Sequence, residues 1–130
     1  MNSVCHEMKA MFAKHETVCG RVLPLVQLIF SKTRFRIICL LLRGEFCVNQ
    51  IVEVVSPGQL PNVSQQLKAL TLAGIIERRR VKRQIIYSLK DQRVKRLIAF
   101  LQQEFLNENS DGKAVEALQA LKPGFSVHMD

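Results

Sequence analysis

The spacing of apolar residues predicts a chain built mainly of helices. From Val4 to Phe30, apolar side chains recur every three or four residues, which places them on one face of a helix. One long helix or two consecutive helices would fit this pattern. A bend is expected at Gly20, Pro24 and the stretch from Thr17 to Gly20, because glycine and proline both weaken a helix interior. Further along, Asp91 can cap a helix with a second apolar face. That face consists of Val94, Leu97, Ile98, Leu101 and Phe105.

The middle of the chain predicts three more helices, two of them joined by a tight turn. A helix from Thr33 to Leu42 is apolar nearly all round and is followed by Gly44, so we expect it at the centre of the fold. Asn49 could cap a short helix that ends at Val55, and the Ser-Pro-Gly sequence at 56–58 predicts a turn after it. The next helix has a stripe expected to be buried: Leu60, Val63, Leu67 and Leu70. Its other side is polar and is expected to face water: Asn62, Ser64, Gln65, Gln66 and Lys68. Two short helices around a tight turn are typical of a helix-turn-helix.

The segment from Ile75 to Leu89 has the pattern of a β-hairpin with a cationic tip. Apolar residues at both ends enclose the basic runs Arg78-Arg79-Arg80 and Lys82-Arg83. A helix-turn-helix followed by such a hairpin is a winged helix. The predicted fold class is therefore mainly α with a small β-hairpin, in a winged helix-turn-helix.

The net charge of the chain supports a nucleic-acid partner. The formal charge is +8, and residues 61–90 alone carry seven Lys and Arg against one Glu. Residues 1–20 are neutral overall and residues 91–130 are slightly acidic. Clustered cations suit a phosphate backbone or an acidic membrane surface, because their binding releases counterions. Since the cluster coincides with the predicted helix-turn-helix and hairpin, we interpret it as a double-stranded DNA face.

The sequence gives no sign of a membrane or export segment. The longest apolar runs, 22–30 and 37–42, are far shorter than the roughly 20 residues of a membrane span. The first residues lack the basic start and cleavage site of a secretory signal. The four cysteines, Cys5, Cys19, Cys39 and Cys47, are therefore expected to be thiols in a reducing cytoplasm.

The predicted DNA contacts divide into base-reading and phosphate-binding residues. Gln65 and Gln66 each carry a side-chain amide that can pair with adenine through two hydrogen bonds. The Ser64 hydroxyl can donate or accept a hydrogen bond, and Asn62 lies on the same polar face of the helix. Lys68 can reach phosphate. The hairpin cations are expected to neutralise phosphates, which sets affinity but carries no sequence information. They are Arg78, Arg79, Arg80, Lys82 and Arg83.

The sequence also allows three alternatives to DNA binding to be compared with it. The polar helix face and charged hairpin could simply be solvated, or the basic hairpin could bind an acidic protein partner. An enzyme is disfavoured, because the sequence has no glycine-rich phosphate loop and no paired carboxylates in an apolar context. Its three histidines, His6, His15 and His128, all lie near the ends of the chain.

Three segments resemble the ArsR/SmtB family of bacterial repressors over about residues 25–105. The segments are 44–48 (Gly-Glu-Phe-Cys-Val), 63–70 (Val-Ser-Gln-Gln-Leu-Lys-Ala-Leu) and 73–79 (Ala-Gly-Ile-Ile-Glu-Arg-Arg). The resemblance implies a homodimer, built from the first and last helices, that binds palindromic operators and is released by an effector. The wide apolar stripe of the helix after Asp91, together with Phe100, agrees with a dimer face. The wing turn lacks the glycine often found there in the family.

These observations divide the chain into three parts. Residues 1–20 are expected to form an N-terminal helical arm, and residues 21–108 the winged helix-turn-helix domain for DNA binding and dimerisation. Residues 109–130 form a C-terminal extension, expected to be loose apart from a short amphipathic segment, Ala114 to Leu121.

The resemblance also implies where a metal could bind, although none is expected to be required. The family's zinc site in its last helix is absent, because no histidine lies between Asp91 and Glu108. Its arsenic or cadmium site aligns with Cys47-Val48-Asn49, where one of two thiolates is missing. Cys5 and Cys19 are the candidates to complete such a metal or metalloid site. On one unbroken helix they would lie about 21 Å apart, so the arm must break or the other subunit must contribute.

Cys39 is the second sensor candidate. It aligns with a cysteine of the family's persulfide- and redox-responsive branch, which segment 60–66 also resembles. Arg36 and Arg43 lie three residues before and four residues after it, where they could favour the thiolate. The partner cysteine of that branch aligns with Leu106, so Cys39 would react alone or pair with Cys19. An inert buried thiol is the alternative.

Overall fold

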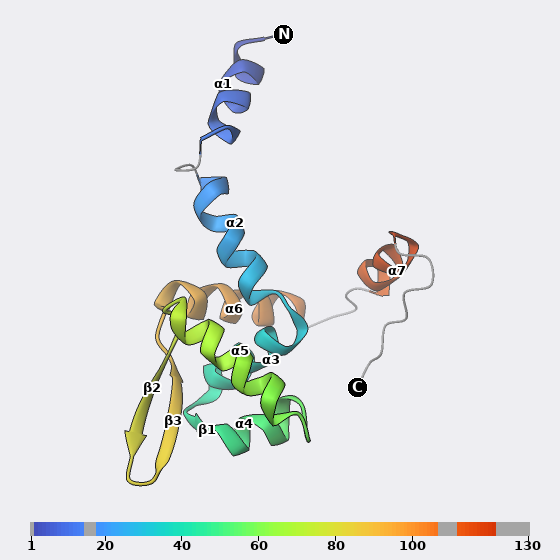
Figure 1. Cartoon of the computed structure of the whole chain (residues 1–130). Coiled ribbons are helices and arrows are strands. Elements are labelled where there is room, and N and C mark those ends of the chain that lie inside the picture. The colour runs from blue at the N-terminus through green and yellow to red at the C-terminus, as the bar shows by residue number, and fades with distance from the viewer. Residues whose placement is uncertain (1, 15–17, 107–111, 122–130) are drawn as a thin grey trace. The chain divides into compact units, whose positions relative to one another are not determined.

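The computed structural model describes residues 2–14, 18–106 and 112–121, within two compact units, Met1–Lys95 and Arg96–Asp130. The first unit holds α1 (Ser3–Phe12), α2 (Val18–Ile29), α3 (Lys32–Arg43), β1 (Phe46–Cys47), α4 (Val48–Val55), α5 (Leu60–Leu72), β2 (Ile76–Val81) and β3 (Gln84–Leu89) (Figure 1). Helix α6 (Gln92–Phe105) begins in this unit, and α7 (Gly112–Leu121) belongs to the second. The prediction of a mainly helical fold with a small β element is confirmed.

The N-terminal segment forms two helices rather than one. Asn2 caps α1 by accepting a hydrogen bond from the Cys5 backbone N–H at 2.9 Å. Helix α1 ends at Phe12 and α2 begins at Val18, within the predicted weak stretch 17–20, whereas Gly20 and Pro24 both lie inside α2. Pro24 lies in the second turn of α2 and has no backbone N–H to donate within the helix.

Helix α3 lies at the centre of the first unit, as its apolar sequence predicted. The Ser31 hydroxyl caps it by accepting from the Arg34 backbone N–H at 3.4 Å, and Gly44 follows its end. Ile37 and Ile38 are fully buried, and α3 contacts α4, α5 and β3. Through these contacts α3 is the base on which the helix-turn-helix is built.

Helices α4 and α5 form the predicted helix-turn-helix. Helix α4 is capped by Cys47, not by Asn49, so it starts at Val48; the backbone N–H of Cys47 donates to Gln50 Oε1 at 3.0 Å. In α5, Val63, Leu67 and Leu70 are fully buried, as predicted. Leu60 was also expected to be buried but is 45% exposed. It is the first residue of α5 and lies in an exposed stretch, 57–61, beyond the packed part of the helix.

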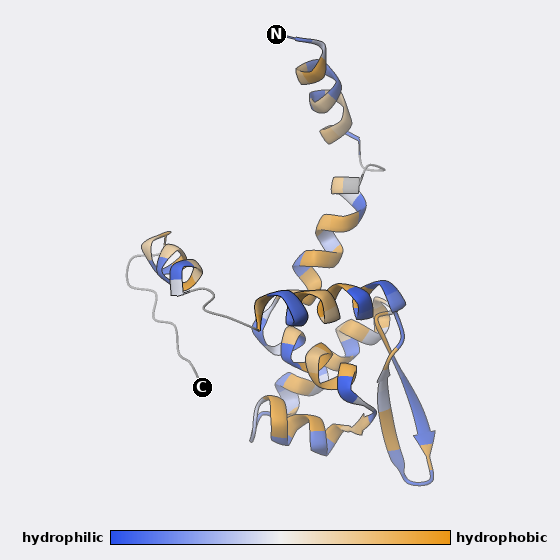
Figure 2. Ribbon diagram, turned by 180° about the vertical axis from the view of Figure 1, so that it is seen from behind, coloured by the Kyte–Doolittle hydropathy of each residue, from blue (hydrophilic) through white to orange (hydrophobic). Residues whose placement is uncertain are grey.

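The wing is part of a three-stranded antiparallel sheet of order β1-β3-β2. The hairpin of β2 and β3 was predicted, but β1 was not, since its two residues are too few to show an alternating pattern. Lys82 and Arg83 form the turn, and Lys82 takes a positive φ of 57°. The missing wing glycine is thus replaced by a lysine in the left-handed conformation. Figure 2 shows β2 as hydrophilic over most of its length, which agrees with the exposure of every residue after Ile76.

Asp91 caps α6 as predicted, and its contribution should depend on pH. Its Oδ1 accepts from the backbone N–H groups of Arg93 and Val94, at 2.9 and 3.3 Å. Hydrogen bonds from the Arg93 side chain lower the pKa of Asp91 below its ordinary value of 3.8. We expect Asp91→Ala to lower the free energy of unfolding by about 1 kcal/mol at neutral pH, measured by urea denaturation.

The sign of the pH effect follows from the lowered pKa. The stabilisation by Asp91 should be fully present above pH 3.8, the ordinary pKa. It should be lost as the pH falls through the lower pKa of the folded state. The gap between wild type and Asp91→Ala should therefore close in acid. A gap that stays constant below that pH would contradict the assigned cap.

The second unit contains the rest of α6 and the separate helix α7. Phe100, Phe105 and Leu106 are 57%, 55% and 74% exposed, so the end of α6 carries an apolar surface. Helix α7 begins two residues before the predicted amphipathic segment and has no buried residue. Residues 109–111 and 122–130 of the predicted C-terminal extension, and 107–108 before it, lie outside the described residues. None of the described helices is long and apolar enough to cross a membrane.

Candidate nucleic-acid interface

The predicted recognition residues on α5 fall into two groups. Ser64, Gln65 and Lys68 are exposed, as expected. Asn62 and Gln66 are half-buried, so the prediction that they face water is wrong for these two. The exposed group is thus the part of the predicted polar face that a DNA groove can reach without any rearrangement.

The half-buried pair takes part in a network that starts at Arg34. Gln66 Oε1 accepts from Arg34 Nη1 at 2.6 Å, and Gln66 Nε2 donates to Asn62 Oδ1 at 3.1 Å. Arg34 Nε also donates to the backbone carbonyl of Leu28 near the end of α2. Sequence reasoning missed Arg34, because no local pattern pairs residues 32 positions apart.

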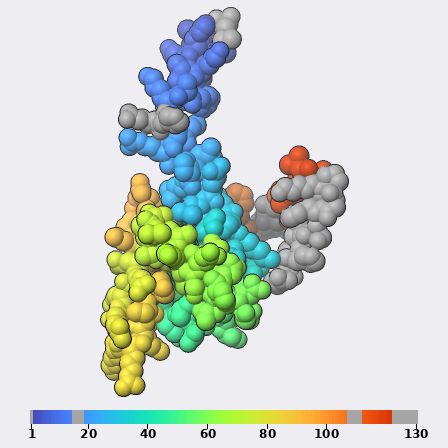
Figure 3. Space-filling view, in the orientation of Figure 1, coloured from blue at the N-terminus to red at the C-terminus, as the bar shows by residue number. Residues whose placement is uncertain are grey.

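Three of the five predicted wing cations lie on β2, whose pleat divides them, and the other two form the turn. Alternate residues of a strand point to opposite faces, so Arg78 and Arg80 share one face and Arg79 lies on the other. The Arg79 guanidinium forms an ion pair with the Glu45 carboxylate just before β1. At the tip, Arg80 Nε donates to the carbonyl of Lys82 at 3.3 Å, and Lys82 and Arg83 are exposed. The wing projects beyond the surface formed by α4 and α5 (Figure 3).

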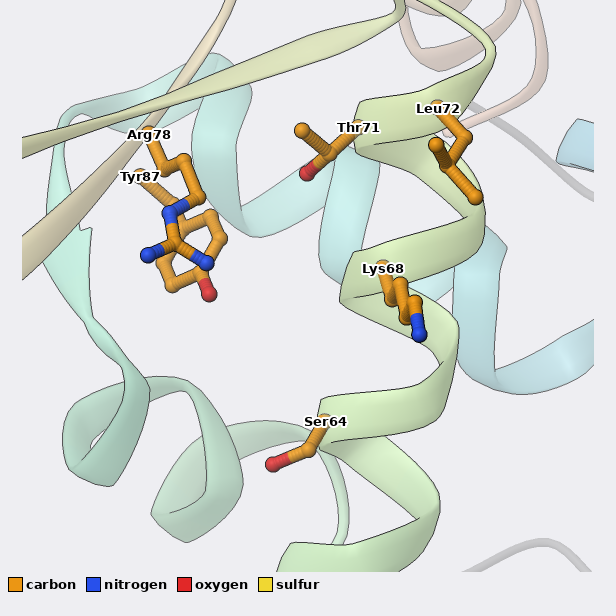
Figure 4. Close-up of a pocket in the computed structure, with 6 residues that line it drawn as sticks. All are labelled: Ser64, Lys68, Thr71, Leu72, Arg78 and Tyr87. Carbon is orange, nitrogen blue, oxygen red and sulfur yellow. The ribbon is translucent and has the colours of Figure 1, made fainter.

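A groove of about 480 Å³ separates α5 from the wing. Figure 4 shows its lining, with Ser64 and Lys68 on α5 and with Arg78 and Tyr87 on the two strands of the hairpin. Thr71 and Leu72 complete it. Two cations from separate elements therefore border one concave surface, which suits a phosphate backbone.

Thr71, Leu72 and Tyr87 were not among the predicted contacts. Thr71 Oγ1 donates to the Leu67 carbonyl at 2.7 Å, and Leu72 is 79% exposed. Tyr87 is the cross-strand partner of Arg78. Counting outwards from the two-residue turn at Lys82-Arg83 would have placed Tyr87 beside Arg78, so the sequence did contain that signal.

The Glu45–Arg79 pair leads to a prediction about DNA affinity. Glu45→Gln removes a carboxylate that competes with phosphate for Arg79 and repels the DNA backbone. We expect DNA affinity to rise roughly threefold to tenfold at low salt and the gain to shrink as salt screens it. The measurement is a fluorescence anisotropy titration on a labelled duplex. Glu7→Gln on α1 makes the same charge change and should have little effect. An equal gain from both variants would show that net charge alone is responsible.

The four cysteines all lie within the described residues and none forms a disulfide. Cys5 and Cys19 are exposed on α1 and α2, and Cys39 and Cys47 are half-buried. The Arg36 guanidinium, one turn before Cys39, donates to the Val55 carbonyl at 3.3 Å. Part of its positive charge is therefore directed at the C-terminal end of α4. Within the described ranges, no three Cys, His, Asp or Glu side chains gather as metal ligands would.

A helix-turn-helix, an exposed polar face on its second helix and a cationic wing across a groove define a winged helix-turn-helix DNA-binding protein. The family model for the arsR family of bacterial regulatory proteins matches residues 31–78. The chain is 32% identical over 97 residues to the biofilm growth-associated repressor of Xylella fastidiosa strain Temecula1, covering 75% of this chain and 82% of that protein. The chain therefore belongs to the ArsR family.

Solved structures agree with this assignment. The crystal structure of the transcriptional repressor BigR from Xylella fastidiosa matches with a TM-score of 0.61 and 30% identity, over 81% of this chain and 97% of that one. The homodimeric winged helix-turn-helix domain of Mb0332 from Mycobacterium bovis matches with a TM-score of 0.57 and 25% identity, over 85% and 91%. The protein is thus a DNA-binding transcriptional repressor rather than an enzyme.

Proposed function

We propose that this repressor binds a palindromic operator as a homodimer and is released from it by thiol chemistry. The observation that carries the operator proposal is the groove between α5 and the wing, which Lys68 on α5 and Arg78 on the wing both line. Ser64 and Gln65 lie on the exposed side of the same helix. One element can thus read bases while the other binds phosphates.

Two observations support the homodimer. Mb0332, a neighbour in fold, is described as homodimeric. In this chain, α1 and α2 expose apolar side chains, among them Phe12 at 58%, Val22 at 44% and Leu23 at 54%. Such a surface is costly in water and is typical of an interface. A two-fold symmetric dimer would present two copies of α5, which matches a palindromic site.

The effector proposal rests on the thiols. Cys19 is exposed on α2, and Cys39 is half-buried on α3, the helix that contacts α4 and α5. Oxidation or persulfidation of Cys39 would therefore alter the helix on which the helix-turn-helix packs. The alternative is a thiolate site for a metal or metalloid ion, with Cys47 at the start of α4 and Cys5 and Cys19 from the N-terminal helices, brought together by a second subunit.

DNA-binding titrations of the reduced protein test this proposal. They are run on a duplex selected by the protein, with and without diamide, a persulfide donor, or Zn²⁺, Cd²⁺ or As(III), and repeated on each Cys→Ser variant. We expect diamide or the persulfide donor to weaken binding in the wild type and not in Cys39→Ser. Release by a metal ion that is lost in Cys47→Ser would support the alternative. If no treatment changes the affinity, both sensor proposals are wrong.

A further inference from the structure

The Arg34–Gln66–Asn62 network fixes the orientation of every group in it. An arginine side chain has only donors, so the Gln66 atom that faces it must be the amide oxygen. The Gln66 amide nitrogen then faces Asn62, where only the side-chain oxygen can accept it. Both polar atoms of the Gln66 amide are thus bound within the protein.

A glutamine that reads adenine needs those same two atoms. Recognition in the major groove uses the amide oxygen to accept from the adenine N6 amino group and the amide nitrogen to donate to N7. Each of these atoms keeps one further lone pair or hydrogen, but the bonds to Arg34 and Asn62 hold the half-buried Gln66 amide in one orientation within the protein. Gln65 is exposed, and its side chain makes no hydrogen bond within the described part of the chain.

We propose that Arg34 and Gln66 are positioning residues for the recognition helix and that Gln65 is the glutamine that reads the operator. This rests on the proposed binding to a specific operator. The buried contacts of α5, made by Val63, Leu67 and Leu70, are apolar and therefore not directional. The hydrogen bond from Arg34 is charge-assisted and directional, and it sets the rotation of α5 relative to α2 and α3.

The position of Arg34 suits this role. It lies in the first turn of α3, and its Nε donates to the Leu28 carbonyl, one residue before the end of α2. A cation at this point also favours the negative end of the α2 dipole. One side chain therefore connects the end of α2, the start of α3 and the middle of α5, so the α5 surface that meets DNA is oriented by the rest of the first unit.

The test compares base preference in variants of the two neighbouring glutamines. Wild-type protein selects bound duplexes from a randomised library, and the preference at each base pair is then measured for Gln65→Ala, Gln66→Met and Gln66→Glu. Gln65→Ala should lower discrimination at one base pair of each half-site about tenfold. Gln66→Met should weaken binding to all duplexes in parallel, by roughly threefold to tenfold. Gln66→Glu keeps an acceptor for Arg34 and should leave the preference profile unchanged.

Arg34→Met completes a double-mutant cycle. If Arg34 acts through Gln66, the loss of affinity in Arg34→Met/Gln66→Met should be no larger than the greater of the two single losses. Should Arg34→Met fail to fold, the base preference of Gln66→Glu still distinguishes a positioning role of Gln66 from a base-reading role. A base-reading Gln66 would shift its preference toward cytosine on becoming glutamate.

The outcomes separate this inference from the function on which it rests. Suppose that the wild type selects a sequence but that Gln66→Glu changes the base preference, or that the losses of affinity in the double-mutant cycle are fully additive. Either result overturns the positioning role of Gln66 and leaves specific operator binding intact. If the wild type enriches no sequence from the library, specific operator binding is wrong. The assignment of Gln65 as the base-reading residue is then wrong as well.

Discussion

Replacing Arg80, Lys82 and Arg83 together by glutamine is expected to weaken DNA binding by about a hundredfold or more at moderate salt. Each cation at the wing tip that neutralises a phosphate releases condensed counterions, and this release is the main source of affinity for the backbone. The slope of log affinity against log salt should become less steep by roughly 2.7 for each subunit, at about 0.9 per phosphate. Anisotropy titrations at several salt concentrations measure both quantities.

A matched variant controls for total charge in this experiment. Lys9, Lys14 and Arg21 lie before the helix-turn-helix, and their replacement by glutamine removes the same three charges. This control should keep nearly the full salt slope. If it loses as much affinity as the wing variant, the protein attracts DNA through its overall charge, and the wing has no special role.

Leu67→Ala is expected to have the largest effect on stability, lowering the free energy of unfolding by about 2 to 5 kcal/mol. Leu67 is fully buried on α5, which contacts α3, α4 and β2, so its truncation leaves a cavity at the base of the recognition helix. Urea denaturation followed by circular dichroism measures the loss. All proteins are compared at one chain concentration, since dimerisation would couple stability to concentration.

Leu72→Ala is the matched control for this variant. It makes the same chemical change near the end of the same helix, but Leu72 is 79% exposed, so its truncation should change stability by no more than about 0.5 kcal/mol. Similar losses from the two variants would mean that burial of α5 does not stabilise the fold as described.

The sequence was sufficient wherever the structure depends on local patterns. The apolar spacing of Val63, Leu67 and Leu70 predicted the buried side of α5, and all three are fully buried. Asp91 was recognised as a helix cap because the required acceptor comes directly before the helix. The wing was predicted from apolar residues at both ends of a segment that encloses two short basic runs. Each of these signals spans only a few neighbouring residues.

The sequence was insufficient wherever a side chain's role depends on a distant partner. Gln65 and Gln66 are identical neighbours, yet one is exposed and the other is bound to Arg34, which lies 32 positions away. Arg79 looks like its neighbours in the basic run, but the pleat directs it to Glu45, at a separation of 34 residues. The strand β1 exists only because β3 lies beside it. These distinctions arise from tertiary packing, which no local pattern contains.

The measurement that tests the central claim most directly is the salt dependence of binding to a selected duplex, compared with a scrambled duplex of the same composition. The account predicts that log affinity falls linearly and steeply with log salt for both duplexes, and that the selected one binds more tightly throughout. The preference for the selected duplex should be smaller in Gln65→Ala, and the slope of log affinity against log salt should be less steep in the wing variant. An affinity that does not respond to salt or to sequence would contradict the assignment of α5 and the wing as a DNA-reading surface.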